Sequence, residues 1–155
     1  GMKNTHPIEE VREAVYGEDK YLFPTLPVLP LSAVVKVDYN VRGCPMTQIE
    51  FLKVFTSLVM GKLPIEPEHS VCVECKLNEN ECVYEKGMIC LGPVTRAGCD
   101  AHCTGVGQYC TGCRGLVPEP NLNGMEEILV SHGLSVDEAW KRLELYNAVK
   151  LEGVK

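Results

Sequence analysis

The feature of this sequence that most restricts its fold is a dense run of cysteines between residues 72 and 113. Eight of the nine cysteines fall there, in the order Cys72-x2-Cys75-x6-Cys82-x7-Cys90 and then Cys99-x3-Cys103-x6-Cys110-x2-Cys113. Each half supplies four thiols, the number that a cubane iron–sulfur cluster or a structural zinc ion takes. A CxxC pair places two sulfurs on one local turn, so little loop-closure entropy is lost when both bind one centre. The spacing therefore predicts two separate four-thiolate centres.

Disulfide bonds and zinc are the alternatives to iron–sulfur clusters. Three features disfavour disulfides: the odd number of cysteines, the absence of a visible secretory signal and the short spacings. Zinc uses the same residues and similar CxxC pairs, so spacing alone leaves zinc and iron–sulfur open. Small residues crowd the cysteines, as in CLGP, AGC, CTGVG and CTGCRG, and their N–H groups can approach cluster sulfur. We therefore predict two [4Fe-4S] clusters, with a zinc-stabilised interaction module without a redox role as the alternative.

Charge and composition exclude several other classes of function. The formal net charge of −6 disfavours nucleic acid as a partner, because phosphate contacts need clustered Lys and Arg. No run approaches the roughly 20 apolar residues of a membrane span. No catalytic set is visible: a Ser–His–Asp triad, a P-loop and a GxGxxG turn are all missing from a credible context, so we predict no catalytic residue on this chain. The acidic residues near the first cysteines, Glu66, Glu68 and Glu74, are interpreted as a solvated face.

The N-terminal part has the pattern of a small α/β unit. Residues 7–16 favour a short helix, residues 22–31 carry three prolines typical of a polyproline-like path, and residues 33–39 (AVVKVDY) favour a strand. Residues 46–61 are the strongest helical segment, with Thr47 as its cap and one broad apolar face that we expect to be buried. This strand followed by a helix predicts the closing unit of an α/β domain.

The remainder of the chain is predicted to be irregular and then helical. Residues 64–120 have few long apolar runs, so we expect ligation of metal rather than a hydrophobic core to order them. Helical patterns return at residues 124–132 and 135–149. The predicted fold class is α+β with much irregular loop, in three parts: the end of an α/β unit (1–63), a two-cluster domain (64–120) and a C-terminal helical cap (121–155).

These motifs resemble a known family. The segments VCVECK and CVYEKGMICLGPVTRAGCDAHCTGVGQYCTGCRG are similar to the C-terminal cluster-binding region of [NiFe]-hydrogenase small subunits. The likeness is to the cytoplasmic type, such as sulfhydrogenase delta and F420-non-reducing hydrogenase small subunits. VDYNVRGCP, which contains Cys44, resembles the end of the family's flavodoxin-like domain. The resemblance covers roughly residues 8–117, and it implies that residues 1–63 are a remnant of a flavodoxin-like unit.

The resemblance also implies roles for the cysteines. Cys72, Cys75, Cys82 and Cys90 would bind a distal cluster near the electron exit, and Cys99, Cys103, Cys110 and Cys113 a medial cluster. Cys44 matches the last ligand of a third, proximal cluster, whose other three ligands lie in an N-terminal half that is missing from this sequence. We therefore expect Cys44 to be an orphan thiol and a proximal cluster only where that half is present. A C-terminal fragment of a longer subunit is favoured over a natural short relative.

The function that the resemblance implies is electron relay in the cytoplasm. This chain would pass electrons between a large catalytic hydrogenase subunit and a flavin or iron–sulfur partner, as an electron-transfer subunit without a complete active site of its own. A cluster protein of another complex, such as a respiratory-type relative, is a further alternative.

The roles of four basic residues near the cysteines can each be interpreted in two ways. His69 is interpreted as solvent-exposed rather than as a distal ligand. His102 is either a hydrogen-bond partner of cluster sulfur or a surface residue. Arg96 and Arg114 either offset the negative charge of thiolate-bound clusters or form surface ion pairs.

Overall fold

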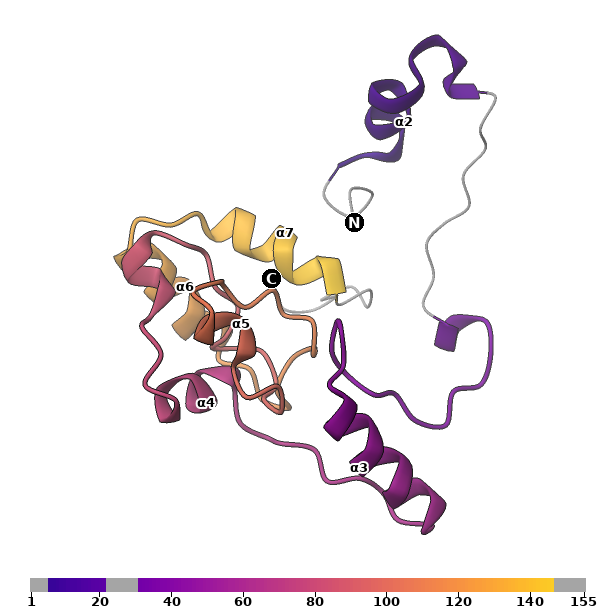
Figure 1. The fold of residues 1–155 in the computed structure, drawn as a ribbon. Coiled ribbons are helices and arrows are strands. Elements are labelled where there is room, and N and C mark those ends of the chain that lie inside the picture. Colours follow the sequence, from indigo (N-terminus) through magenta and orange to yellow (C-terminus); the bar gives the residue numbers. More distant parts are fainter. Residues whose placement is uncertain (1–5, 22–30, 147–155) are drawn as a thin grey trace.

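The computed structural model describes residues 6–21 and 31–146, and within them the chain is helical with long connecting loops (Figure 1). The α-helices are α2 (Ile8–Tyr16), α3 (Gln48–Val59), α4 (Val71–Leu77), α5 (His102–Gly105), α6 (Leu122–Ser131) and α7 (Val136–Tyr146). Three 3-10 helices join them: η1 (Gly17–Tyr21), η2 (Leu31–Ala33) and η3 (Val83–Lys86). Among the described residues, β-pairing is limited to two isolated antiparallel bridges, Ser70 with Arg96 and Thr95 with Leu116.

One hydrophobic core lies between residues 71 and 143. Its fully buried side chains include Leu91 in the cysteine-rich loops, Met125 and Leu129 on α6, and Leu143 on α7. Burial of such a side chain contributes about 1.5–3 kcal/mol. Residues 64–120 therefore contribute to a hydrophobic core although they have few long apolar runs, and the expectation that metal ligation orders them stays a prediction. The C-terminal helices supply four of the thirteen buried core residues, and residues 71–110 supply the other nine.

The N-terminal helix is confirmed as α2, whereas the strand that we predicted after it is wrong. Helix α2 begins after Pro7 and ends at Gly17, whose φ is 54°, and in Figure 1 it lies beside η1, away from α4–α7. Residues 22–30, most of the predicted polyproline path, lie outside the described residues. Residues 34–39 form turns and irregular chain, with Val34 and Val35 exposed. A β-rich segment needs a partner strand for its backbone, and residues 33–39 pair with none in the part that the structure describes.

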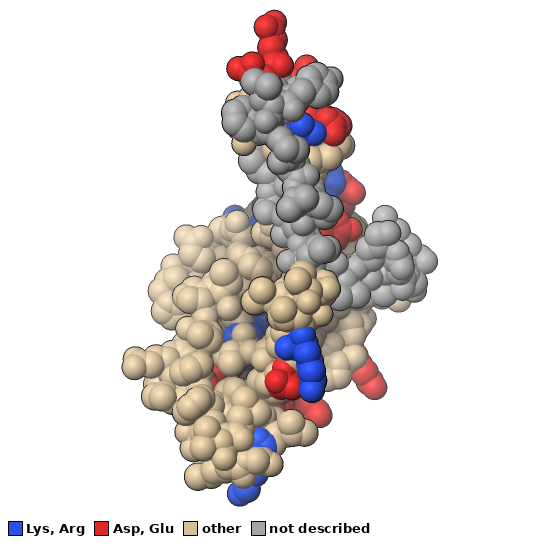
Figure 2. All heavy atoms as spheres, turned by 90° about the vertical axis from the view of Figure 1, so that its right-hand side faces the viewer, with Lys and Arg blue, Asp and Glu red and all other residues tan. Residues whose placement is uncertain are grey.

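Helix α3 forms as predicted but is not packed as predicted. The Thr47 hydroxyl accepts a hydrogen bond from the Glu50 N–H at 3.2 Å, which caps the first turn. None of its residues is buried, and Phe51 and Phe55 stack on each other in the open, with ring centroids 6.0 Å apart. Figure 2 looks onto this side of the molecule and shows a broad lower surface with few charged side chains. The flavodoxin-like unit thus stays a prediction.

The two C-terminal helices are confirmed, with small shifts at their ends. Helix α6 begins at Leu122, two residues before the predicted start, because the Asn121 side chain accepts a hydrogen bond from the Gly124 N–H at 2.8 Å. Helix α7 follows Ser135, whose hydroxyl accepts from the Glu138 N–H at 3.2 Å. Residues 147–149 lie outside the described part. No described helix has the length and apolar character needed to cross a bilayer.

Candidate iron–sulfur sites

All nine cysteines lie in the described part of the chain, and all nine are free thiols. The disulfide alternative is therefore not realised in this structure. The eight clustered cysteines form two sets, which we call the first quartet (Cys72, Cys75, Cys82 and Cys90) and the second quartet (Cys99, Cys103, Cys110 and Cys113).

The first quartet gathers around the loop that contains Gly92. Cys72 and Cys75 lie on one face of α4, Cys82 caps η3, and Cys90 follows the turn at Gly87. A Cβ atom built on Gly92 would lie 3.2 Å from the Cys72 Sγ and 3.4 Å from the Cys90 Sγ. Burial, and then the nearby Cys90, Cys75 and Cys82 thiols, raises the pKa of Cys72 to about 12. The sulfurs of Cys72 and Cys90 therefore lie beside Gly92, and the effect of the Cys75 and Cys82 thiols on Cys72 indicates that these two also lie nearby.

Cys90 is the most deeply set member of the first quartet. The Cys110 N–H donates a hydrogen bond to the Cys90 Sγ at 3.3 Å, and the Tyr84 hydroxyl donates to the Cys90 carbonyl. Burial raises the pKa of the Cys90 thiol, while hydrogen bonds from the N–H groups of Cys110 and Gly92 lower it. The close approach of backbone N–H groups to a sulfur, expected from the small residues of CLGP, is thus present.

The second quartet lines one cavity of about 220 Å³, which we call the second-quartet cavity. Cys99 reaches it from the loop before α5, Cys103 from α5 itself, and Cys110 and Cys113 from the loop after α5. Cys110 is 7 % exposed, and its burial raises the pKa of its thiol to about 12. A water molecule occupies about 30 Å³ of the liquid, so this cavity has room for a group of several atoms.

The donor set and the cavity together fit an iron–sulfur cluster. The four thiols of the second quartet and the Cys44 thiol line a cavity with room for several atoms, and thiolates are the ligands that iron–sulfur clusters take. A zinc ion bound at about 2.3 Å by each sulfur would draw the four sulfurs close together around a single point.

Glu74 shapes the loop that carries Cys99. Its two carboxylate oxygens accept hydrogen bonds from the Gly98 N–H at 2.7 Å and the Ala101 N–H at 3.1 Å. Ala101 has a left-handed backbone with φ of 47°, which needs such support in a residue with a Cβ. The interpretation of Glu74 as part of a solvated face is therefore wrong, because it links α4 of the first quartet to the loop of the second.

Glu66 is likewise paired, whereas Glu68 is exposed as expected. The Glu66 carboxylate accepts from the Tyr39 hydroxyl at 2.9 Å and from the Arg42 Nε at 3.1 Å, and it lies 3.3 Å from Arg96. Arg96 therefore takes part in an ion pair.

Arg114 connects α3 to the second quartet. It is 3 % exposed, and its guanidinium donates to both carboxylate oxygens of Glu50, at 2.8 and 2.5 Å. Its Nε donates to the Ala97 carbonyl at 2.9 Å, and the side chain lines the second-quartet cavity. Arg114 thus combines both interpretations from the sequence, since it carries charge at the cavity and forms an ion pair, although a buried one.

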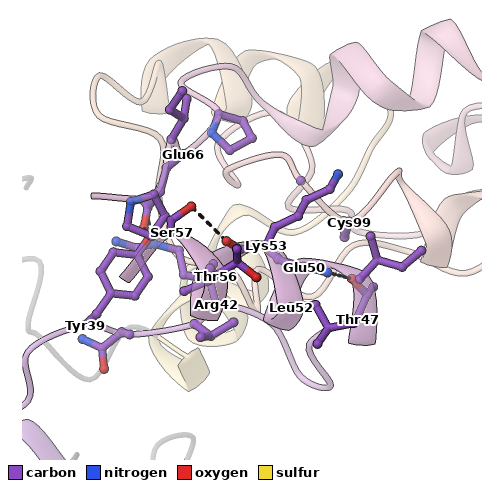
Figure 3. Close-up of a pocket in the computed structure, with 18 of the residues that line it drawn as sticks. Tyr39, Arg42, Thr47, Glu50, Leu52, Lys53, Thr56, Ser57, Glu66 and Cys99 are labelled. Atoms are coloured by element: carbon purple, nitrogen blue, oxygen red, sulfur yellow. Dashed lines mark hydrogen bonds and ion pairs between the residues drawn. The ribbon is translucent and has the colours of Figure 1, made fainter. Parts of the chain in front are cut away.

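A larger open groove lies next to this ion pair. It has a volume of about 950 Å³ and runs between α3 and residues 39–42, 62–67 and 98–100. Figure 3 shows Arg42, Glu50 and Glu66 around it, with Thr47 and Cys99 at one end. The sequence did not predict this groove, because it depends on how α3 lies against the cysteine loops.

The two histidines near the cysteines are both exposed. His69 is exposed, as the solvent-exposed interpretation predicts, and its carbonyl accepts a hydrogen bond from the Ala97 N–H at 3.0 Å. His102 lines the cavity on its outer side. Cys44, which the sequence left as an orphan, also lines this cavity. Its position was not visible in the cysteine spacing, since it lies far upstream.

Comparison with known proteins identifies the family. Sulfhydrogenase 2 subunit delta of Pyrococcus furiosus is 43 % identical over 126 residues, which cover 79 % of this chain and 53 % of that protein. The iron-sulfur subunit of the F420-non-reducing hydrogenase of Archaeoglobus profundus is 29 % identical, over 89 % of this chain and 59 % of its own length. A vhu subunit of the F420-non-reducing hydrogenase of Methanocaldococcus jannaschii is 33 % identical, over 74 % and 50 %. No family model matches the chain.

The chain belongs to the family of hydrogenase iron–sulfur subunits. Within that family it is similar to the delta subunit of sulfhydrogenase and to the iron–sulfur subunit of F420-non-reducing hydrogenases, as the motifs around the cysteines predicted. The chain spans about half the length of the curated relatives it matches.

Proposed function

We propose that this chain is the electron-transfer segment of a [NiFe]-hydrogenase-type oxidoreductase and that it holds two [4Fe-4S] clusters. The observation that carries the proposal is the second-quartet cavity of about 220 Å³, which is lined by all four thiols of the second quartet. The first quartet, of which the Cys72 and Cys90 sulfurs lie beside Gly92, would hold the other cluster. When bound, each cluster supplies a centre that accepts and releases one electron.

The protein's own residues prepare each site for that exchange. Four thiolates fix each set of irons, and the burial of Cys90 and Cys110 limits the access of water. The Cys110 N–H donates to a first-quartet sulfur, and hydrogen bonds of this kind raise the reduction potential. The positive charge of Arg114 beside the second quartet favours an added electron there, while Glu50 partly offsets that charge.

A direct route joins the two sites. The hydrogen bond from the Cys110 N–H to the Cys90 Sγ, 3.3 Å long, connects a ligand of one quartet to a ligand of the other. The Leu91 N–H donates in turn to the Cys110 carbonyl at 3.0 Å, so the two loops are held together at this point. We infer that electrons pass between the sites across this pair of loops.

The partners follow from the family and belong to the proposal. The relatives are named as subunits of hydrogenases. We infer that a large catalytic subunit carries out the chemistry on hydrogen, since no catalytic residue is proposed on this chain. A flavin or iron–sulfur protein would take electrons from the exposed side of the first quartet, where Cys82 lies.

Visible spectroscopy of the anaerobically purified or reconstituted chain tests the proposal. We expect a brown protein with broad absorption that bleaches on addition of dithionite, because thiolate-bound iron changes oxidation state. Cys90→Ser should remove about half of the bleachable absorption, whereas Ser57→Ala on exposed α3 serves as a control that leaves it unchanged. A colourless protein that binds zinc instead would contradict the proposal and support the interaction module.

A further inference from the structure

We propose that Glu74 is a positioning residue for the second cluster, which holds the loop around Cys99 in shape and keeps the reduction potential of that cluster low. The inference rests on the proposed function, because it requires a cluster at the second quartet. Glu74 lies directly before Cys75 on α4, the helix of the first quartet. Its carboxylate nevertheless accepts from the Gly98 N–H at 2.7 Å and the Ala101 N–H at 3.1 Å, one on each side of Cys99. A residue of the first site thus binds the loop that carries a ligand of the second.

The backbone that follows Cys99 needs support of this kind. Asp100 and Ala101 both have a left-handed backbone, with φ of 55° and 47°. Residues with a Cβ rarely adopt this conformation, and it persists where surrounding contacts hold it in place. Because both carboxylate oxygens of Glu74 bind N–H groups of this loop, we expect the loop to relax and the Cys99 sulfur to shift when the carboxylate is removed.

A second contact between the same two elements lies closer to solvent. The Asn78 Nδ2, just after α4, donates to the Asp100 carbonyl at 3.0 Å and to the Asp100 carboxylate at 2.9 Å. Both of these hydrogen bonds are exposed, so water competes with them, whereas both bonds of Glu74 are partly buried. Glu74 therefore makes the stronger link from α4 to the Cys99 loop.

Arg114 holds the other side of this loop with the opposite charge. Its Nε donates to the Ala97 carbonyl at 2.9 Å, and a Cβ atom built on Gly98 would lie 2.6 Å from its Nη2. Burial and then the Glu74 carboxylate raise the pKa of the Cys99 thiol, whereas the positive charge of Arg114 lowers it. The Cys99 sulfur thus lies within the influence of both charges, and Glu74 opposes Arg114.

The two effects of Glu74 on the reduction potential have the same sign. A negative charge beside a cluster disfavours an added electron. In addition, the Ala101 N–H, which Glu74 binds, also forms a hydrogen bond with the Cys99 thiol. A hydrogen bond to a cluster ligand stabilises negative charge and favours the reduced form, so a carboxylate that competes for the donor favours the oxidised form. Removal of the Glu74 charge should therefore raise the potential of the second cluster.

A redox titration of Glu74→Gln, followed by electron paramagnetic resonance, tests the effect on the potential. Glutamine keeps the shape and one acceptor oxygen but removes the charge. The titration step that changes in Cys103→Ala identifies the second cluster. We expect the midpoint of that step to rise in Glu74→Gln, with a smaller shift of the other step. The midpoint is read on the loaded fraction, so incomplete loading does not hide the shift, and a midpoint equal to that of wild type overturns the inference.

Glu68→Gln is the matched control for the charge. It removes the same charge from an exposed side chain near the first quartet, and both midpoints should stay at their wild-type values. An equal rise of the second midpoint in Glu68→Gln overturns the inference, because net charge alone would then account for the effect.

Iron loss from Glu74→Ala to an excess of chelator tests the positioning role. Alanine removes both acceptor oxygens, so about half of the iron should be lost several-fold faster than in wild type, while Glu68→Gln keeps the wild-type rate. A wild-type rate in Glu74→Ala overturns the inference and leaves the proposed function intact if two clusters are present. A wild type that takes up no cluster overturns the proposed function and this inference with it, which separates the two failures.

Discussion

Substitution of Gly92 by alanine probes the geometry of the first quartet most directly. The new methyl group would lie 3.2 Å from the Cys72 Sγ and 3.4 Å from the Cys90 Sγ, closer than carbon and sulfur comfortably pack. In the metal-free chain these side chains can rotate away. In the loaded chain iron fixes both sulfurs, so the strain remains.

The size of the effect follows from this difference. Overpacking by one methyl group costs about 1–3 kcal/mol. The backbone of Gly92 lies outside the left-handed region, so alanine is allowed there. Alanine also restricts the unfolded chain, which stabilises the folded protein by about 0.4–1 kcal/mol. This gain is equal in the loaded and metal-free forms, so it does not change cluster binding. With about 1.4 kcal/mol per factor of ten, the first cluster should bind roughly 5- to 150-fold more weakly.

The assay is the rate of iron loss to an excess of chelator under argon, followed by the visible absorbance. Gly92→Ala should convert the slow loss of one cluster into a fast phase with about half of the total amplitude. Gly105→Ala is the matched control: its added Cβ would lie 3.7 Å from the Asn80 side chain, an ordinary contact, and its kinetics should match wild type. Identical kinetics for Gly92→Ala and wild type would refute the arrangement of sulfurs around Gly92.

Two further outcomes are expected from ion pairs away from the sulfurs. Glu50→Gln removes the negative charge that the buried Arg114 faces. The free energy of unfolding of the metal-free chain should therefore fall by about 1–3 kcal/mol in urea titrations. An unchanged midpoint of unfolding would contradict the role of this ion pair. The Ile128 carbonyl and the Glu85 carboxylate raise the pKa of His132, so Glu85→Gln should lower that pKa in an NMR titration. Because the pKa of His132 is raised in the folded state, its protonation stabilises the fold at pH values below the ordinary pKa of histidine. This contribution disappears as the pH rises through the folded-state pKa. A pKa that stays the same in Glu85→Gln would contradict this assignment.

Local chemistry made the helices predictable. Thr47 and Ser135 are capping residues whose side-chain oxygens accept an N–H from the next turn, and both caps are present in the structure. The start of α6 was missed by two residues because Asn121 was not recognised as its cap. Capping signals involve residues only a few positions apart, so they can be detected in a single sequence.

Features that depend on distant partners were not predictable. The strand expected at residues 33–39 has the right residue types, but its formation depends on a neighbouring strand that the local sequence does not specify. In the same way, the apolar face of α3 indicates a helix but not what covers it, and its phenylalanines remain exposed.

The cysteine pattern predicts two quartets of ligands, but it does not predict which residues support them. Glu74 was misjudged because a carboxylate that accepts two backbone N–H groups has the same sequence context as a solvated one. Arg114 and Cys44 reach the second quartet only through the fold, across long loops. Spacing identifies ligands that share a turn, whereas residues that support them must be found in three dimensions.

The most direct test of the account is an analysis of iron, zinc and acid-labile sulfide in the anaerobically reconstituted chain. Two four-iron clusters predict about eight iron and about eight sulfide per chain with no zinc. About two zinc ions per chain, bound in preference to iron and without sulfide, would contradict the central claim that each quartet of thiols surrounds an iron–sulfur cluster.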